Sequence, residues 1–110
     1  MQGGKAPTAR QKRWHNWLAS LPCCDTGAAC EHLHHCAGSS ARHNKIWIGQ
    51  DWVVPLTDAA HMGPEGIHKR ANRKRYEKEW FAQIIERAKA EQVESIPPEE
   101  VINAIMDYRR

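Results

Sequence analysis

The sequence predicts an α+β fold, in which a short strand region lies between an N-terminal helix and C-terminal helices. Three observations support this class. Apolar residues recur at helical spacing close to the N-terminus and again over residues 69–92, and residues 46–56 (IWIGQDWVVPL) form an apolar run typical of a strand. The length of 110 residues fits one domain with a modest core.

The N-terminal half is expected to begin with an arm and a helix. Residues 1–7 predict a flexible basic arm, and Thr8 can cap a helix over residues 9–20. Pro22 ends this helix, because proline lacks the backbone N–H that a helix interior needs. The segments expected next are a turn at 23–30, a short segment at 31–36, a polar loop at 37–45, and a strand at 46–56 with a break at Gly49.

The C-terminal half is predicted to be helical. Thr57 or Asp58 can N-cap a short helix through His61. Residues 8–75 are interpreted as the core with its N-terminal helix, and residues 76–110 as a helical extension packed on that core. Two further helices are expected: one over 69–92, whose apolar stripe at Tyr76, Trp80, Ile84 and Ala88 is more typical of a core than of an interface, and one over 99–108, after Pro97 and Pro98.

Basic residues gather in two clusters, although the formal net charge is only +3. Two basic clusters on either side of a polar centre suit a polyanion such as nucleic acid, and a solvated helical face is an equally open interpretation. The first cluster contains Lys5, Arg10, Lys12 and Arg13, and the second contains Lys69, Arg70, Arg73, Lys74 and Arg75.

The sequence predicts neither a membrane segment nor a disulfide framework. No stretch approaches the roughly 18 consecutive apolar residues that cross a bilayer, and the first residues do not resemble an export signal. We therefore expect a cytoplasmic protein, in which metal binding or free thiols are favoured over disulfides. The cysteines concerned are Cys23, Cys24, Cys30 and Cys36.

Histidines carry the strongest chemical signal, because the chain contains seven of them. Hydrolysis of a phosphodiester needs a base for water and a cation that offsets negative charge, and neutral imidazole can serve as the base or as a ligand of the cation. The adjacent pair His34 and His35 can divide these tasks at a distorted strand end, with one ring facing a metal and the other a water. His61 and His68 can complete the coordination.

Three segments carry a resemblance to a known family: KAPTARQKRWHNWLASLPC, HLHHCAGSS and DWVVPLTDAAHMGPEGIHK. Together they resemble the HNH (ββα-metal) endonuclease superfamily of phages and prophages, and most closely its recombination-enhancement (Ref-type) nucleases, which act alongside RecA. The resemblance covers roughly residues 5–80. It implies a small ββα-metal motif and a metal-dependent enzyme that nicks or cleaves DNA in a bacterial host cell.

The resemblance also implies a role for each site residue. His35 matches the general base that activates water, while His34, His61 and His68 match ligands of one divalent metal ion. Asp51 lies near the motif's central asparagine, which braces the loop and orients the base, so aspartate there departs from the family pattern. Candidate ions are Zn, Mn, Ni and Mg, of which Mg prefers oxygen ligands over imidazole.

The family's structural zinc is expected to be absent, because a half-site binds zinc poorly. Of the four positions that hold it in the family, only Cys23 retains a ligand, and Thr26, Thr57 and Ala60 occupy the others. Packing of the five tryptophans would then replace the zinc. An open alternative is that other cysteines rebuild such a site, namely Cys24, Cys30 or Cys36.

The expected partner is DNA, with the second basic cluster (Lys69, Arg70, Arg73, Lys74 and Arg75) gripping its backbone without sequence preference. The family context adds a recombinase filament or phage packaging proteins as candidate partners. Two alternatives stay open: a non-catalytic, zinc-stabilised nucleic-acid-binding module, and an accessory protein of phage recombination or packaging.

Overall fold

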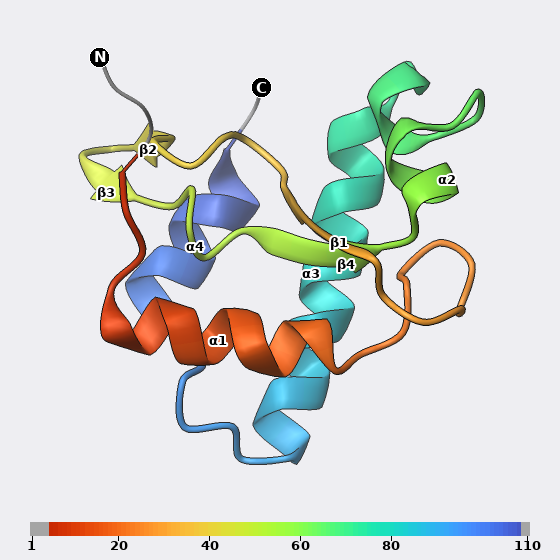
Figure 1. Cartoon of the computed structure of the whole chain (residues 1–110). Helices are drawn as coiled ribbons and strands as arrows, with labels where there is room; N and C mark the ends of the chain where they lie inside the picture. Colours follow the sequence, from red (N-terminus) through yellow and green to blue (C-terminus); the bar gives the residue numbers. More distant parts are fainter. Residues whose placement is uncertain (1–4, 109–110) are drawn as a thin grey trace.

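The computed structural model of the chain describes residues 5–108, so residues 1–4 of the predicted arm lie outside the described part. Within this part, four α-helices pack with two small antiparallel sheets, which confirms the predicted α+β class (Figure 1). The elements are α1 (Ala9–Ala19), β1 (His32–His35), β2 (Arg42–His43), β3 (Ile46–Trp47), β4 (Val53–Leu56), α2 (Asp58–Met62), the 3-10 helix η1 (Ile67–Lys69), α3 (Arg73–Ala90) and α4 (Glu99–Asp107).

The N-terminal helix α1 begins at the predicted cap. The Oγ1 atom of Thr8 accepts a hydrogen bond from the backbone N–H of Gln11 at 3.1 Å, and the Gln11 side chain accepts one from the Thr8 N–H at 2.8 Å. This reciprocal capping satisfies two N–H groups that a helix start leaves without partners. Trp14 and Leu18 on the inner face of α1 are buried, so both capping and tertiary packing stabilise this helix.

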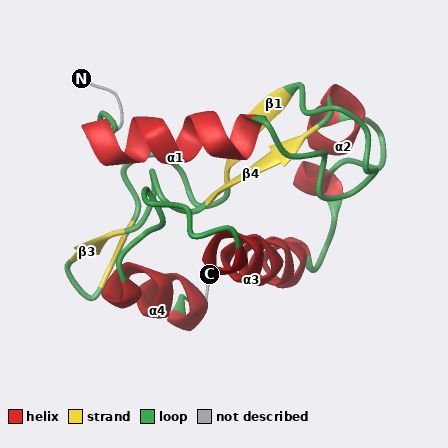
Figure 2. Ribbon diagram, turned by 90° about the horizontal axis from the view of Figure 1, so that it is seen from below, coloured by secondary structure: helices red, strands yellow, loops and turns green. Residues whose placement is uncertain are grey.

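The central sheet pairs β1 with β4 in antiparallel register and lies between α1 and α3 (Figure 2). His34 is opposite Val54, and His35 is opposite Val53. The strand predicted at residues 46–56 is divided in the structure: its first part is β3, which pairs with β2, and its last part is β4. The break includes Gly49, where an added Cβ atom would lie only 2.2 Å from the carbonyl oxygen of Gly38.

The C-terminal helices differ from the prediction mainly at their starts. Thr57 caps α2 as expected, with its Oγ1 accepting from the backbone N–H of Ala60 at 3.1 Å. The long helix α3 begins at Arg73 and not at Lys69, because the preceding residues form η1 and then a turn. It crosses the predicted boundary between core and extension at residues 75–76.

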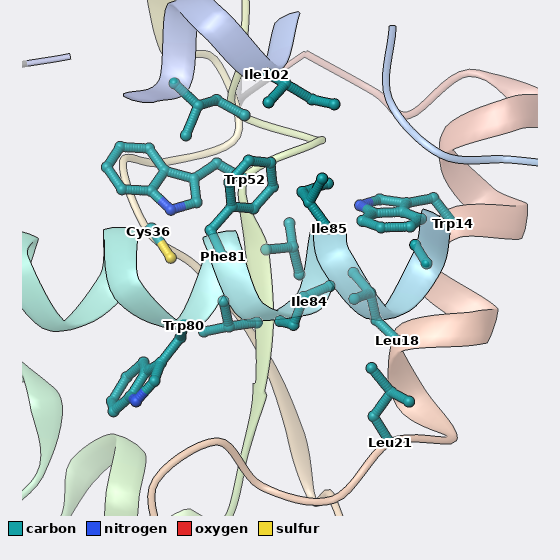
Figure 3. Close-up of a cluster of buried hydrophobic side chains, with 14 of the residues drawn as sticks. Trp14, Leu18, Leu21, Cys36, Trp52, Trp80, Phe81, Ile84, Ile85 and Ile102 are labelled. Carbon is teal, nitrogen blue, oxygen red and sulfur yellow. The ribbon is translucent and has the colours of Figure 1, made fainter. Parts of the chain in front are cut away.

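The hydrophobic core is where the helices meet the central sheet (Figure 3). Trp80, Ile84 and Ala88 of the α3 stripe are buried here and Tyr76 is partly buried against them, in agreement with the prediction that this stripe belongs to a core. Because α3 packs against β4, this core also supports one side of the strand pair that carries His34. The residues labelled in Figure 3 come from α1 and the turn after it (Trp14, Leu18, Leu21), from Cys36 and Trp52, from α3 (Trp80, Phe81, Ile84, Ile85), and from α4 (Ile102).

Candidate metal centre

Three imidazoles from three different elements converge. His34 belongs to β1, His61 to α2 and His68 to η1, and one ligand nitrogen of each lies within 4.8 Å of the other two. The ring centroid of His34 is 5.0 Å from each of the other two centroids, which are 4.8 Å apart. We call this group the histidine triad. It consists of the three residues that the family resemblance assigned to the metal.

Local structure explains how the triad forms. The helix α2 directly follows β4, so the Thr57 cap turns the chain and brings His61 beside the strand pair. The chain then doubles back closely: a Cβ atom on Gly66 would lie 2.8 Å from the His61 carbonyl oxygen. This close approach, which requires glycine, leads into η1 and returns His68 to the same place.

The donor set fits a divalent metal. The Nε2 atoms of His61 and His68 are 3.1 Å apart, and two nitrogens bound to one tetrahedral zinc at about 2.05 Å would be about 3.3 Å apart. The Nδ1 atom of His61 is buried and has no hydrogen-bond partner among the described residues, which is a need that ordered water can meet. His34 is only 3% exposed, whereas His68 is exposed, so the group is open on the His68 side.

Electrostatics keep the outer two imidazoles in the ligand form. Burial lowers the pKa of His61 below its usual value of 6.5, and the neighbouring His34 and His68 rings lower it further. Burial also lowers the pKa of His68, with Arg73 as the next cause. Both rings are therefore neutral at pH 7, and neutral imidazole is the form that binds metals.

A buried carboxylate that the sequence analysis did not single out supports the triad. The Oε2 atom of Glu77, on α3, lies 2.5 Å from Nε2 of His34 and 3.1 Å from Nε of Arg73, and its Oε1 atom lies 3.2 Å from Nζ of Lys74. Burial alone raises the pKa of Glu77, but these three contacts outweigh burial and bring the pKa below its usual value. The signal was present in the sequence, because Glu77 is an acidic residue four positions before Phe81 on the apolar face of the helix.

The predicted base lies apart from the triad. His35 contacts Gln50, with His35 Nε2 at 2.9 Å from the Gln50 Oε1, and its ring meets the edge of His15 from α1 at a centroid distance of 5.9 Å. The alternation of a strand accounts for this, since adjacent residues point to opposite faces. The Gln50 amide donates to the Lys5 carbonyl oxygen at 2.6 Å, so its oxygen faces His35 and accepts from the Nε2–H. The lone pair of the ring is then on Nδ1 of His35, which has no hydrogen-bond partner among the described residues.

Asp51 anchors the loop before β4 to α1. Its carboxylate is 1% exposed and accepts hydrogen bonds from Nη2 of Arg10 at 2.9 Å and from Nε2 of Gln11 at 3.0 Å. Its backbone oxygen accepts a third bond from Nε1 of Trp14 at 3.1 Å. Asp51 therefore braces the loop, and the neighbouring Gln50, which the sequence analysis did not single out, makes the contact with His35.

The second basic cluster lies next to the triad, but most of it has partners within the protein. Arg73 is the closest, with its Nη1 atom 3.3 Å from Nδ1 of His68. Lys69 is exposed. The other members form ion pairs: Arg70 with Asp25 at 2.7 Å, Lys74 with Glu77 at 3.2 Å, and Arg75 with Glu79 at 3.4 Å. Each of these basic residues would have to exchange its partner in order to bind a phosphate.

The four positions that the resemblance assigns to a structural zinc also lie together. The Sγ atom of Cys23 is 3.9 Å from Oγ1 of Thr57 and accepts the backbone N–H of Thr26 at 3.4 Å. Ala60 completes the group through its N–H, which bonds to Thr57. Hydrogen bonds and packing join these positions. Among the described residues, Cys36 is the only cysteine in a group able to hold a metal, together with His34 and Glu77.

A fourth imidazole borders the triad. His32 lies on the same face of β1 as His34, and its ring centroid is 5.3 Å from that of His61. Its Nε2 atom forms an ion pair with Asp58 at the start of α2. Taken singly, His32 resembled a surface residue in the sequence, and its side chain is indeed 49% exposed.

Comparison with known proteins adds no family assignment: no family profile, no curated protein and no solved structure matches the chain. Within residues 5–108, none of the helices combines the length and hydrophobicity needed to pass through a bilayer. The histidine triad and its surroundings are therefore the features from which a function can be inferred.

Proposed function

We propose that the protein is a metal-dependent DNA endonuclease of the HNH type, in which the histidine triad holds one divalent metal and His35 acts as the general base. The convergence of three imidazoles from β1, α2 and η1 is the observation that carries this proposal. The antiparallel pair β1–β4 followed directly by α2 would form the ββα-metal motif. A cytoplasmic location in a bacterial host cell belongs to the same proposal.

In this proposal, His34, His61 and His68 hold the ion, and the exposed side of His68 admits the phosphodiester. The bound ion supplies Lewis-acid chemistry, offsetting negative charge on the phosphate and the leaving oxygen. An all-imidazole donor set favours Zn, Ni, Mn or Co over Mg. Arg73 lies beside His68 and would contribute further positive charge to the binding of the DNA backbone.

The contact with Gln50 supports His35 as the base. His35 donates its Nε2–H to Gln50, so the lone pair of Nδ1 can take a proton from water. Since His35 and His34 are adjacent, a phosphodiester that lies across the end of β1 would meet the metal on one side and His35 on the other. The remaining basic residues Lys69, Arg70, Lys74 and Arg75 would hold the DNA without reading its sequence.

A plasmid-nicking assay with Zn, Ni, Mn, Co and Mg tests this proposal. We expect His61→Ala to lose both metal and cleavage, and His35→Ala to lose cleavage while keeping the metal and DNA binding. His43→Ala is the matched control, because His43 lies on β2 and pairs with Asp107 away from the triad. Undiminished nicking by metal-loaded His35→Ala would remove the base assignment.

One observation favours a second candidate function. The ring of His35 contacts His15 and Gln50 and not the triad, which suits a non-catalytic module whose metal stabilises a nucleic-acid-binding fold. An accessory role in phage recombination or packaging is a version of this candidate, with a recombinase filament or packaging proteins as partners. Stoichiometric zinc, loss of folding on chelation and no cleavage with any metal would favour it.

A further inference from the structure

A fully buried carboxylate contacts the buried member of the histidine triad. Glu77 on α3 is 0% exposed, and it contacts His34, the only triad member that is itself buried. Taking a carboxylate out of water costs several kcal/mol, which close partners must offset. The other buried side chains on this face of α3 are apolar, among them Phe81 and Ile84, so Glu77 is the one buried charge of this helix within the described residues.

The contact between Glu77 and His34 determines which nitrogen of His34 can bind a metal. An ionised carboxylate can only accept hydrogen bonds, so Nε2 of His34 must carry the hydrogen in the 2.5 Å contact with Oε2. The lone pair is then left on Nδ1. Histidines that bind metals commonly donate their other ring N–H to a carboxylate, which sets the tautomer and makes the ligand more basic.

Glu77 also balances the charge beside the triad. Nε of Arg73 is 3.1 Å and Nζ of Lys74 is 3.2 Å from its carboxylate oxygens, and Arg73 reaches His68 as well. Without the carboxylate, Arg73 and Lys74 would keep their hydrogen bonds to the Cys36 carbonyl oxygen but would have no negative charge beside them from Glu77 to offset theirs. Coulomb repulsion between like charges would then weaken metal binding.

We propose that Glu77 is a positioning residue of the metal centre, which holds the His34 ring ready to bind a divalent metal through Nδ1 and screens that metal from Arg73 and Lys74. The inference rests on the metal site of the proposed function, but it does not require that the protein cleave DNA. It assigns a role to a residue on α3, outside the strand pair and the short helices that carry the triad.

Titration of the metal-free, full-length protein with cobalt(II) tests this role, because the visible spectrum of cobalt reports both affinity and ligand type. We expect Glu77→Gln to lower the affinity for cobalt by about 10- to 100-fold and to change the spectrum. Glu79→Gln is the matched control, because Glu79 is an exposed carboxylate of the same helix that pairs with Arg75. We expect this control to match the wild type.

Two additions cover a Glu77→Gln variant that does not fold. Glu77→Asp keeps the charge but shortens the side chain, and we expect an affinity between those of the wild type and of Glu77→Gln. In the wild type without metal, nitrogen NMR of the His34 ring should show the hydrogen on Nε2. A hydrogen on Nδ1 alone would overturn the proposal.

The outcomes separate this inference from the proposed function. A folded Glu77→Gln variant with wild-type cobalt affinity would overturn the positioning role. A sulfur-to-cobalt charge-transfer band would overturn it too, because the metal would then lie between Cys36, His34 and Glu77. Wild-type protein that binds cobalt but cleaves no DNA would overturn only the nuclease proposal, and protein that binds no metal would overturn both.

Discussion

Replacing Asp51 with alanine should destabilise the fold while leaving the metal centre intact. The Asp51 carboxylate is 1% exposed and joins the loop before β4 to Arg10 and Gln11 of α1. The histidine triad is held by other elements, namely β1, α2 and η1. No hydrogen bond or ion pair joins Asp51 to the triad in the described part of the chain. Stability and metal affinity should therefore respond separately to this substitution.

The size of the effect follows from the two contacts. A hydrogen bond to a charged group contributes about 1.5–3 kcal/mol. The lower end applies to Arg10, because its side chain is 26% exposed and water can replace the lost partner. Gln11 is 6% exposed and has less access to water, so its bond lies higher in the range and the total loss is about 3–4.5 kcal/mol. At about 4 °C or more per kcal/mol for a domain of about this size, Tm should fall by about 12 °C or more.

Thermal and urea unfolding of Asp51→Ala, Arg10→Ala and the double variant would measure this loss and the coupling between the two residues. A Tm within about 2 °C of the wild type would refute the reasoning. If the variant keeps its stability but loses cleavage, the result would support the base-orienting role that the family resemblance implies for Asp51.

Three further predictions address the site and the core. Because the pKa values of His61 and His68 lie below 6.5, metal affinity measured by calorimetry should persist as the pH falls to about 6.5 and decline only below it, when the rings become charged; a midpoint above 6.5 would contradict this. Gln50→Leu should slow cleavage by His35 without changing metal affinity, since the hydrogen bonds of Gln50 among the described residues join it to His35, Lys5 and His15 and not to the triad; equal cleavage rates would remove its orienting role. Phe81→Ala should cost about 3–5 kcal/mol in urea unfolding, and a loss below about 1 kcal/mol would show that the core readily collapses into the space.

Local signals in the sequence predicted those parts of the fold that local interactions determine. Thr8 and Thr57 each cap a helix because a side-chain oxygen meets an N–H only three residues away. The start of α3 was placed too early, because the chain between His68 and Arg73 has helical composition but forms a 3-10 helix and a turn. The break at Gly49 was predicted for the strand at residues 46–56, but not that its two parts join different sheets, because pairing with distant segments cannot be read from spacing.

The candidate site was predicted in part. The resemblance named His34, His61 and His68, and the structure brings these three together. The supporting contacts depend on tertiary structure: the one from Glu77 to His34 spans 43 positions. The neighbour of His35 is also missed, because the family pattern points to Asp51 and only the folded loop shows that Gln50 lies against the ring.

The four-residue pairing of β1 with β4 has a consequence for the evolution of this chain. His34 and His35 have the same side chain, so only the register of the strand decides which ring faces α2 and which faces α1. Deletion of a single residue from the turn ahead of β1 could shift the strand by one place, so that each of the two histidines points to the opposite face of the sheet. Gain or loss of residues in that turn should therefore be tolerated mainly in pairs.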